Sequence, residues 1–228
     1  MKNKYELTDE TINLCGITLH RIRALRDIPS AGVKSGDLGG WIEKEYNLRQ
    51  NGDAWVYGNA RVCGNAQVYD DAWVYDNARV YGGAEVYGDA WVYDNARVYD
   101  NARVYGGAEV YGDAKVCGNA EVCGCAEVYD NAEVCGNAKV CGNAEVCGDA
   151  RVCGDADYMV IKNSWSSGRW FTYTRSNKMW KVGCFYGSGE ELIKKAYADS
   201  ELSGKCYEAI VRTQEAIDKA IEEAKEAK

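Results

Sequence analysis

The chain has 228 residues and a formal net charge of -8, and 46% of its residues are hydrophobic, which suits one elongated domain or a core with two small flanking modules. It begins MKNKYELTDE and has no long apolar run, so we expect neither a signal peptide nor a membrane-spanning segment. Pro29 is the only proline, which excludes a proline-rich linker.

Residues 1–51 lack the six-residue repeat that follows them. A strand is predicted over 20–25, preceded by Thr18 and Leu19, and a turn over 36–42 leads into the repeat. The end of a solenoid must be covered, because an open coil exposes strand edges and core side chains. We therefore predict that residues 1–51 form an N-terminal β cap.

Residues 52–160 are built from hexapeptides, eighteen of them over 53–160. Ala recurs every six residues from Ala54 to Ala156, and Val recurs two positions later from Val56 to Val152. Ala and Val therefore point to the same side of a strand, and the residue between them points outward. Tyr or Cys follows each Val, and the two positions before the next Ala are mostly Gly, Asp and Asn, which are typical of turns. Each hexapeptide is predicted to be a short strand followed by a corner.

The outward positions fall into step every 18 residues rather than every 12 or 24. They form three columns, which are Trp55, Trp73, Trp91, Glu109, Glu127, Glu145; Arg61, Arg79, Arg97, Lys115, Glu133, Arg151; and Gln67, Glu85, Arg103, Glu121, Lys139, Asp157. A coil of three hexapeptides would place each column on one side. The sequence thus predicts a mainly β fold, a triangular parallel β-helix of about six coils.

The inward Val56 and Ala60, and each later pair with the same spacing, resemble the hexapeptide-repeat family. That resemblance implies a left-handed parallel β-helix. The bulky Tyr or Cys after each Val departs from the family pattern. The stretches GDLGGWIEKEYNL over 36–48 and GCFYGSGEELIKKAYADSE over 183–201 resemble repeat proteins carried by bacteriophages and prophages.

Residues 161–228 are predicted to form a small C-terminal α+β module. Strands are expected over 158–162, 169–174, 178–185 and 206–212. Ser188 and Glu191 have the spacing of a capping box, which predicts a helix to about Asp199. Residues 213–228 are predicted to form an exposed helix, because Ile217, Ala220, Ile221 and Ala224 share one face.

Catalytic groups are scarce in this sequence. In the resembling family, acyltransferases use a histidine base near loops that interrupt the coils, but this chain has one histidine, His20, and no inserted loop. Three-histidine zinc chemistry is excluded by that count. The prediction is a chain that is not an enzyme, with no catalytic residue, cofactor or metal site, and acyl transfer is the disfavoured alternative.

The eleven cysteines point to a reducing compartment, the cytoplasm of a bacterial host. Cys117, Cys135 and Cys153 share one column, and Cys123 and Cys141 share another. They are interpreted as small corner hydrophobes, with a soft-metal site as the alternative. Side chains stacked in register run parallel, so disulfides are not expected.

The predicted partner-binding surface follows the outward columns. It comprises Trp55, Trp73 and Trp91 as an exposed aromatic stripe, Arg61, Arg79 and Arg97 on the adjacent side, and Glu109, Glu127 and Glu145 below the tryptophans. Stacking within the ladder is an alternative reason for the aromatic residues. Residues 52–156 carry 17 acidic and 7 basic residues, which argues against nucleic-acid binding.

These features predict a non-enzymatic binding or scaffold protein that contacts its partner through the sides of the β-helix and through the C-terminal module. The phage resemblance implies that its partner is a host or phage protein and that it acts as an inhibitor of a host defence system. The alternatives are a structural homo-oligomer, trimeric or dimeric, and an atypical hexapeptide-repeat acyltransferase.

Overall fold

The computed structural model describes residues 3–165 and 167–226. The chain divides into two compact units, one ending at Asp155 and one beginning at Ala156. Within the described residues, no helix has the length and apolar character needed to cross a membrane.

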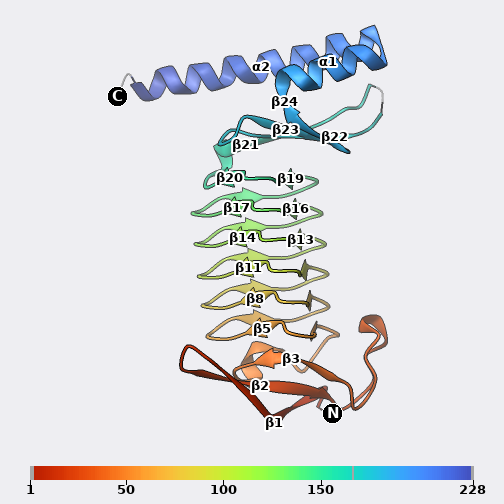
Figure 1. Cartoon of the computed structure of the whole chain (residues 1–228), viewed down its shortest axis with the longest axis vertical. Helices are drawn as coiled ribbons and strands as arrows, with labels where there is room; N and C mark the ends of the chain where they lie inside the picture. The colour runs from red at the N-terminus through yellow and green to blue at the C-terminus, as the bar shows by residue number, and fades with distance from the viewer. Residues whose placement is uncertain (1–2, 166, 227–228) are drawn as a thin grey trace. The chain divides into compact units, whose positions relative to one another are not determined.

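The first unit is a β-solenoid of about six coils with strands at its N-terminal end, as Figure 1 shows. One side, here called the tryptophan sheet, consists of β4 (Trp55–Val56), β7 (Trp73–Val74), β10 (Trp91–Val92), β13 (Glu109–Val110), β16 (Glu127–Val128) and β19 (Glu145–Val146).

A second side, the arginine sheet, contains β5 (Arg61–Val62), β8 (Arg79–Val80), β11 (Arg97–Val98), β14 (Lys115–Val116), β17 (Glu133–Val134) and β20 (Arg151–Val152). The third side, the alternating sheet, contains β6 (Gln67–Val68), β9 (Glu85–Val86), β12 (Arg103–Val104), β15 (Glu121–Val122) and β18 (Lys139–Val140). The predicted three-sided coil is confirmed.

The solenoid core consists of the Ala and Val columns. Every Ala from Ala54 to Ala150 and every Val from Val56 to Val152 is at most 1% exposed. Parallel strands join the coils, with Trp73 N donating to Ala90 O at 2.9 Å and Tyr75 N donating to Val92 O at 3.0 Å. The eighteenth hexapeptide does not follow this pattern, because Asp155–Asp157 forms a short 3-10 helix and Ala156 is exposed.

The corners require a residue that accepts positive φ. Gly82 has a φ of 73°, and a Cβ there would lie 2.9 Å from Asp100 N in the next coil. Asp76 and Asp94 have a φ of 55° at the equivalent position of their hexapeptides. Asp tolerates this conformation better than most side chains. The turn chemistry predicted from the sequence accounts for the bends between sides.

Three strands precede the regular coils: β1 (Tyr5–Leu14), β2 (Ile17–Ala24) and β3 (Leu38–Ile42). β1 and β2 are antiparallel, and β2 pairs with β3. β3 then pairs in parallel with β5, so the N-terminal strands extend the arginine sheet. The segment predicted as a turn before the repeat is therefore a strand that covers the edge of the first coil.

The second unit has a four-stranded antiparallel sheet and two helices. Its elements are β21 (Tyr158–Lys162), β22 (Trp170–Thr174), β23 (Met179–Val182), β24 (Phe185–Ser188), α1 (Gly189–Asp199) and α2 (Glu201–Glu226). The capping box is present, because Ser188 accepts from Glu191 N and Glu191 accepts from Ser188 N.

Two predictions for this unit are wrong. Residues 206–212 form a helix rather than a strand, since they lie inside α2. Val211 is 1% exposed and Tyr207 is 8% exposed, four residues apart on the helical face that packs into the core of this unit. The run over 178–185 forms parts of two strands, because Gly183 and Cys184 make a turn between β23 and β24.

A buried polar network ties α2 to the sheet of the second unit. Asp218 accepts hydrogen bonds from the Tyr173 hydroxyl, from Arg175 Nε at 3.0 Å and from Gln214 Nε2 at 2.8 Å. Burial acts to raise the pKa of Asp218, but these donors outweigh it and hold the pKa below its usual range. The network satisfies a charge that would otherwise be costly to bury.

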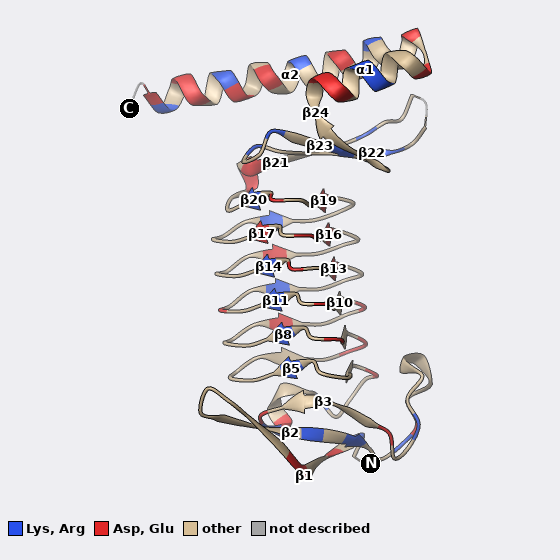
Figure 2. Cartoon of the chain, in the orientation of Figure 1, with Lys and Arg blue, Asp and Glu red and all other residues tan. Residues whose placement is uncertain are grey.

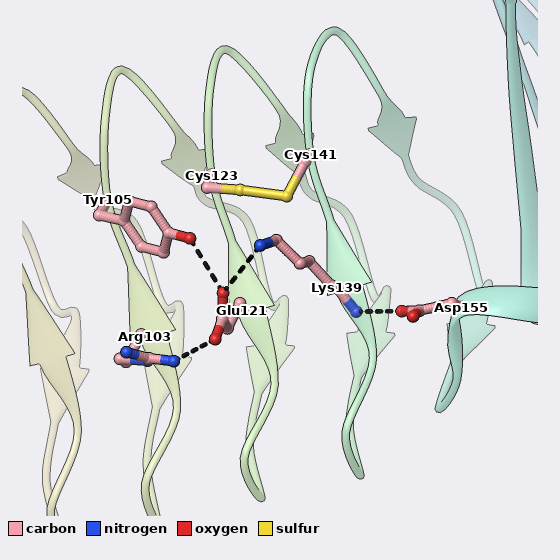
Figure 3. Close-up of a disulfide and its surroundings, with 7 residues drawn as sticks. All are labelled: Arg103, Tyr105, Glu121, Cys123, Lys139, Cys141 and Asp155. Atoms are coloured by element: carbon pink, nitrogen blue, oxygen red, sulfur yellow. Dashed lines mark hydrogen bonds and ion pairs between the residues drawn. A yellow bond between two sulfur atoms is a disulfide. The ribbon is translucent and has the colours of Figure 1, made fainter.

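The cysteine ladder contains two disulfides, Cys123–Cys141 and Cys135–Cys153. Figure 3 shows the first of them joining neighbouring coils. The expectation that stacked cysteines do not pair is wrong for these four residues. Their Cα atoms are 4.7 and 4.5 Å apart, within the range of roughly 4.4–6.8 Å that disulfides span. They lie in the corners after the strands, where the two side chains can turn toward each other.

We predict seven free thiols in the denatured, unreduced protein and eleven after reduction, as counted with a thiol reagent. Each bond closes a loop of 18 residues, so reduction should lower the free energy of unfolding by up to about 3 kcal/mol per bond. A count of eleven before reduction would show that the corner cysteines are thiols in the purified protein.

Lys4 is a buried cation beneath the first coil. Its side chain is 0% exposed, and Nζ donates to Ala54 O at 2.8 Å. Burial and the nearby Arg26 lower the pKa of Lys4 to about 8, from 10.5 for an exposed lysine. Between these two pH values the unfolded chain holds this proton and the folded chain releases it. Folding therefore gains stability from Lys4 as the pH rises through this window.

This linkage is testable with Lys4→Met, which removes the titrating group. The difference in free energy of unfolding, native protein minus variant, should be flat below pH 8. It should then rise toward pH 10.5 with a slope of at most about 1.4 kcal/mol per pH unit. Urea titrations at a series of pH values measure it. If the difference in free energy of unfolding stays constant across this pH range, Lys4 does not have a lowered pKa in the folded protein.

Candidate binding groove

Contrary to the prediction, the tryptophan column is not exposed along its whole length, because its first residue is buried. Trp55 is 1% exposed and packs edge-on against Tyr5, with ring centroids 6.2 Å apart. The expectation that Trp55 is part of an exposed stripe is wrong, because the N-terminal strands cover it. Trp73 and Trp91 are half-buried and stacked, with centroids 5.1 Å apart and planes 5° from parallel. The accessible stripe is this pair.

Two grooves flank the stacked indoles. The first, of about 410 Å³, is lined by Ser30, Asp53, Asp71, Trp73, Asp89, Trp91, Gly107 and Glu109. The second, of about 400 Å³, is lined by Ala31, Tyr57, Gly58, Trp73, Tyr75, Asp76 and Trp91. We call the first the acidic groove and the second the aromatic groove.

The N-terminal segment closes both grooves near the first coil. Ser30 and Ala31 belong to a 3-10 helix, Pro29–Ala31. The Ser30 hydroxyl donates to Asp53 at 2.7 Å, and the Tyr57 hydroxyl donates to Ala31 O at 2.7 Å. Burial raises the pKa of Tyr57 to about 12, so this donor stays protonated at physiological pH. These two hydrogen bonds fix the 3-10 helix at the edge of the tryptophan sheet.

Asp53, Asp71 and Asp89 are groove residues that the sequence analysis did not select. Each stands directly before the Ala of a tryptophan strand, so the chain contains Asp-Ala-Trp three times, at 53–55, 71–73 and 89–91. In the next three coils this position is Gly107, Cys125 and Asn143. Asp and Trp thus occur and disappear together, a signal that was present in the sequence.

Glu109, Glu127 and Glu145 continue the tryptophan column in register, as predicted. Their charges are not left to solvent alone. The Tyr93 hydroxyl donates to Glu109 at 2.9 Å, and the Tyr111 hydroxyl donates to Glu127 at 2.9 Å. Burial, followed by the bond to Glu109, raises the pKa of Tyr93 well above its usual range. A tyrosine from the coil before supplies the donor, which offsets the repulsion expected between stacked carboxylates.

Arg61, Arg79 and Arg97 lie on a different side of the solenoid from the tryptophans. They face one another in register on the arginine sheet, followed by Lys115. Arg79 and Arg97 are exposed, and Arg61 is half-buried. The structure therefore separates the predicted residues into two surfaces. The acidic and aromatic grooves lie beside the predicted residues of the tryptophan sheet.

The third side alternates in charge, which Figure 2 shows as acidic and basic residues succeeding each other from coil to coil. Glu85 faces Arg103, Arg103 faces Glu121, and Glu121 faces Lys139. Glu121 pairs with Arg103, lies 3.5 Å from Lys139 Nζ and accepts from the Tyr105 hydroxyl at 2.9 Å (Figure 3). The Tyr105 hydrogen bond is the main cause of a lowered pKa at Glu121. On this side, acidic and basic side chains of successive coils therefore neutralise one another's charge.

His20 lies in β2, where Nδ1 is 3.1 Å from Thr8 O. It is half-buried and is not among the residues that line either groove. In the part of the chain that the structure describes, no group of three or more His, Cys, Asp or Glu is arranged to hold a metal ion. The chemistry that these grooves offer is aromatic and anionic.

A family model described as the YdcK beta solenoid repeat matches residues 54–70, 66–82, 72–88 and 96–112, all within the solenoid. The comparison with curated proteins finds no match. The fold and these matches define a β-solenoid repeat protein. The matched segments include Trp73 but not Trp91, so the family model covers only part of the groove lining.

Proposed function

We propose that this chain is a non-enzymatic binding protein, in which the solenoid is a rigid scaffold and the stacked Trp73 and Trp91 contact a protein partner. The observation that carries the proposal is that the fold does not need tryptophan at these positions. Glu109, Glu127 and Glu145 occupy the same column with the same strand pairing. Half-buried indoles beside open grooves are typical of contact surfaces.

The packing of Trp73 supports a binding role over a purely structural one. Its indole Nε1 is buried and has no hydrogen-bond partner within the described residues. A buried donor without an acceptor costs about 1–3 kcal/mol. Tyrosine, which forms stacked pairs in neighbouring columns with centroids 4.7–5.1 Å apart, would give a ladder without a buried indole nitrogen. Contact with a partner therefore explains the two tryptophans better than stacking for stability does.

The resemblances in the sequence specify this proposal further. They support a left-handed solenoid of the hexapeptide-repeat type, encoded by a phage and acting in the host cytoplasm on a host or phage protein. Inhibition of a host defence system is the role that fits such a partner. The number of free thiols before reduction is relevant to the proposed cytoplasmic location, because a reducing cytoplasm opposes disulfides. Self-association through the same face is the second candidate, since stacked aromatic residues also suit an interface between copies.

The test is quantitative capture of partners from bacterial lysate by immobilised protein. Trp73→Ser with Trp91→Ser should lose the captured protein, because both indoles of the stack are removed. Trp73→Tyr with Trp91→Tyr should keep part of it, because tyrosine stacks in neighbouring columns. Circular dichroism and thermal unfolding confirm that each variant is folded.

Arg79→Gln with Arg97→Gln is the matched control, with two substitutions on another side of the solenoid. Its capture should equal that of the native chain. Loss of capture in the arginine variant alone would move the contact surface to the arginine sheet and overturn the proposal. A native chain that forms a stable dimer or trimer in solution, and monomers only in the Trp→Ser variant, would assign the face to self-association instead.

A further inference from the structure

The turns that line the acidic groove carry acidic residues although the turn conformation does not require an acidic side chain. Asp precedes Ala in the first three coils of the tryptophan sheet, at Asp53, Asp71 and Asp89. At the same turn position, the first three strands of the arginine sheet are preceded by Asn59, Asn77 and Asn95. The backbone thus accepts the neutral amide at this position, yet the tryptophan sheet carries carboxylates.

The carboxylates of the groove differ in how many hydrogen bonds and ion pairs they form with other residues of the protein. Asp53 accepts from Ser30 and lies 3.7 Å from Arg26, and Glu109 accepts from Tyr93. Asp71 is exposed and accepts one backbone hydrogen bond, from Asp53 N at 3.1 Å.

Asp89 is also exposed, and no side-chain partner is found for it within the described part of the chain. Asp71 and Asp89 line the groove together with the two indoles, each two residues before its tryptophan. They are the charges available to a ligand.

The lining contains no basic residue among those that the structure describes. An anionic ligand such as a nucleic acid would be repelled by four carboxyl groups. An apolar ligand would leave Asp71 and Asp89 desolvated without compensation, which is costly. A cation meets both features at once, because the face of an indole attracts cations electrostatically and the carboxylates pair with them.

We infer that the acidic groove binds an extended, arginine-bearing segment of the partner protein, with a guanidinium group against the indole pair and between Asp71 and Asp89. This inference rests on the proposed binding function. Arginine fits better than lysine, because its planar guanidinium stacks on aromatic faces and pairs with carboxylates at two points. The volume of about 410 Å³ is within the usual range of small binding pockets.

The probe is a peptide with the sequence Arg-Gly-Ser-Arg-Gly-Ser-Arg, blocked at both ends, titrated into the native chain by calorimetry and tryptophan fluorescence. We expect binding that weakens with added salt. The equivalent lysine peptide should bind more weakly, and the equivalent glutamate peptide should not bind. Asp71→Asn with Asp89→Asn should lower the affinity for the arginine peptide by about tenfold or more, since it removes the charges but keeps residues that this turn accepts.

Asp113→Asn with Asp149→Asn is the matched control. These residues stand at the same turn position of the arginine sheet, so the control has the same change in net charge. Its affinity should equal that of the native chain. An equal loss in both variants would show attraction to the net charge alone and overturn the inference, as would a native chain that does not bind the arginine peptide.

The capture experiment separates this inference from the proposed function. Partner capture that depends on Trp73 and Trp91 but not on Asp71 and Asp89, with no peptide binding, would leave the binding function standing and reject the arginine ligand. Peptide binding in the groove together with capture that is independent of both tryptophans would reject the proposed contact surface instead.

Discussion

Every side chain in this solenoid lies directly beside the residue eighteen positions away, at the strand spacing of about 4.8 Å. That constraint governs the surface as much as the core. Inside, it stacks Ala on Ala and Val on Val, which are buried along the whole repeat. Outside, it brings identical or like-charged side chains together unless the sequence varies from coil to coil. Two of the three sides resolve this conflict in different ways.

The alternating sheet changes sign from one coil to the next, and its charges pair. The acidic half of the tryptophan sheet keeps one sign, but tyrosine hydroxyls from the preceding coil donate to Glu109 and Glu127. The first coils of the same sheet instead combine stacked indoles with Asp71 and Asp89. Nothing in the coil geometry requires that combination, because later coils pair equally well without it. The groove is thus where this otherwise regular structure departs from what stability explains.

The regular part of the fold was predictable from the sequence because the period of Ala and Val specifies the core and the step of eighteen specifies the sides. The end of the solenoid was not predictable at the same level. Trp55 belongs to the repeat by its position, but strands distant in sequence bury it against Tyr5. Residues 206–212 are predicted as a strand but form part of a helix, because Val211 and its neighbours favour both and tertiary packing decides between them. The grooves depend on Ser30 and Ala31, which no periodicity relates to the coils.

The central claim, that surface residues interact across eighteen positions and not across six, is tested most directly by two double-mutant cycles. Arg103 pairs with Glu121, eighteen positions away, whereas Glu109 is six positions away on another side. Replacing Arg103 with Gln in combination with Glu121→Gln should give a coupling free energy between a few tenths of a kcal/mol and about 1 kcal/mol at low salt. The cycle with Glu109→Gln, equal in charge and closer in sequence, should give none. Equal coupling in the two cycles, or coupling to Glu109 alone, would contradict the account.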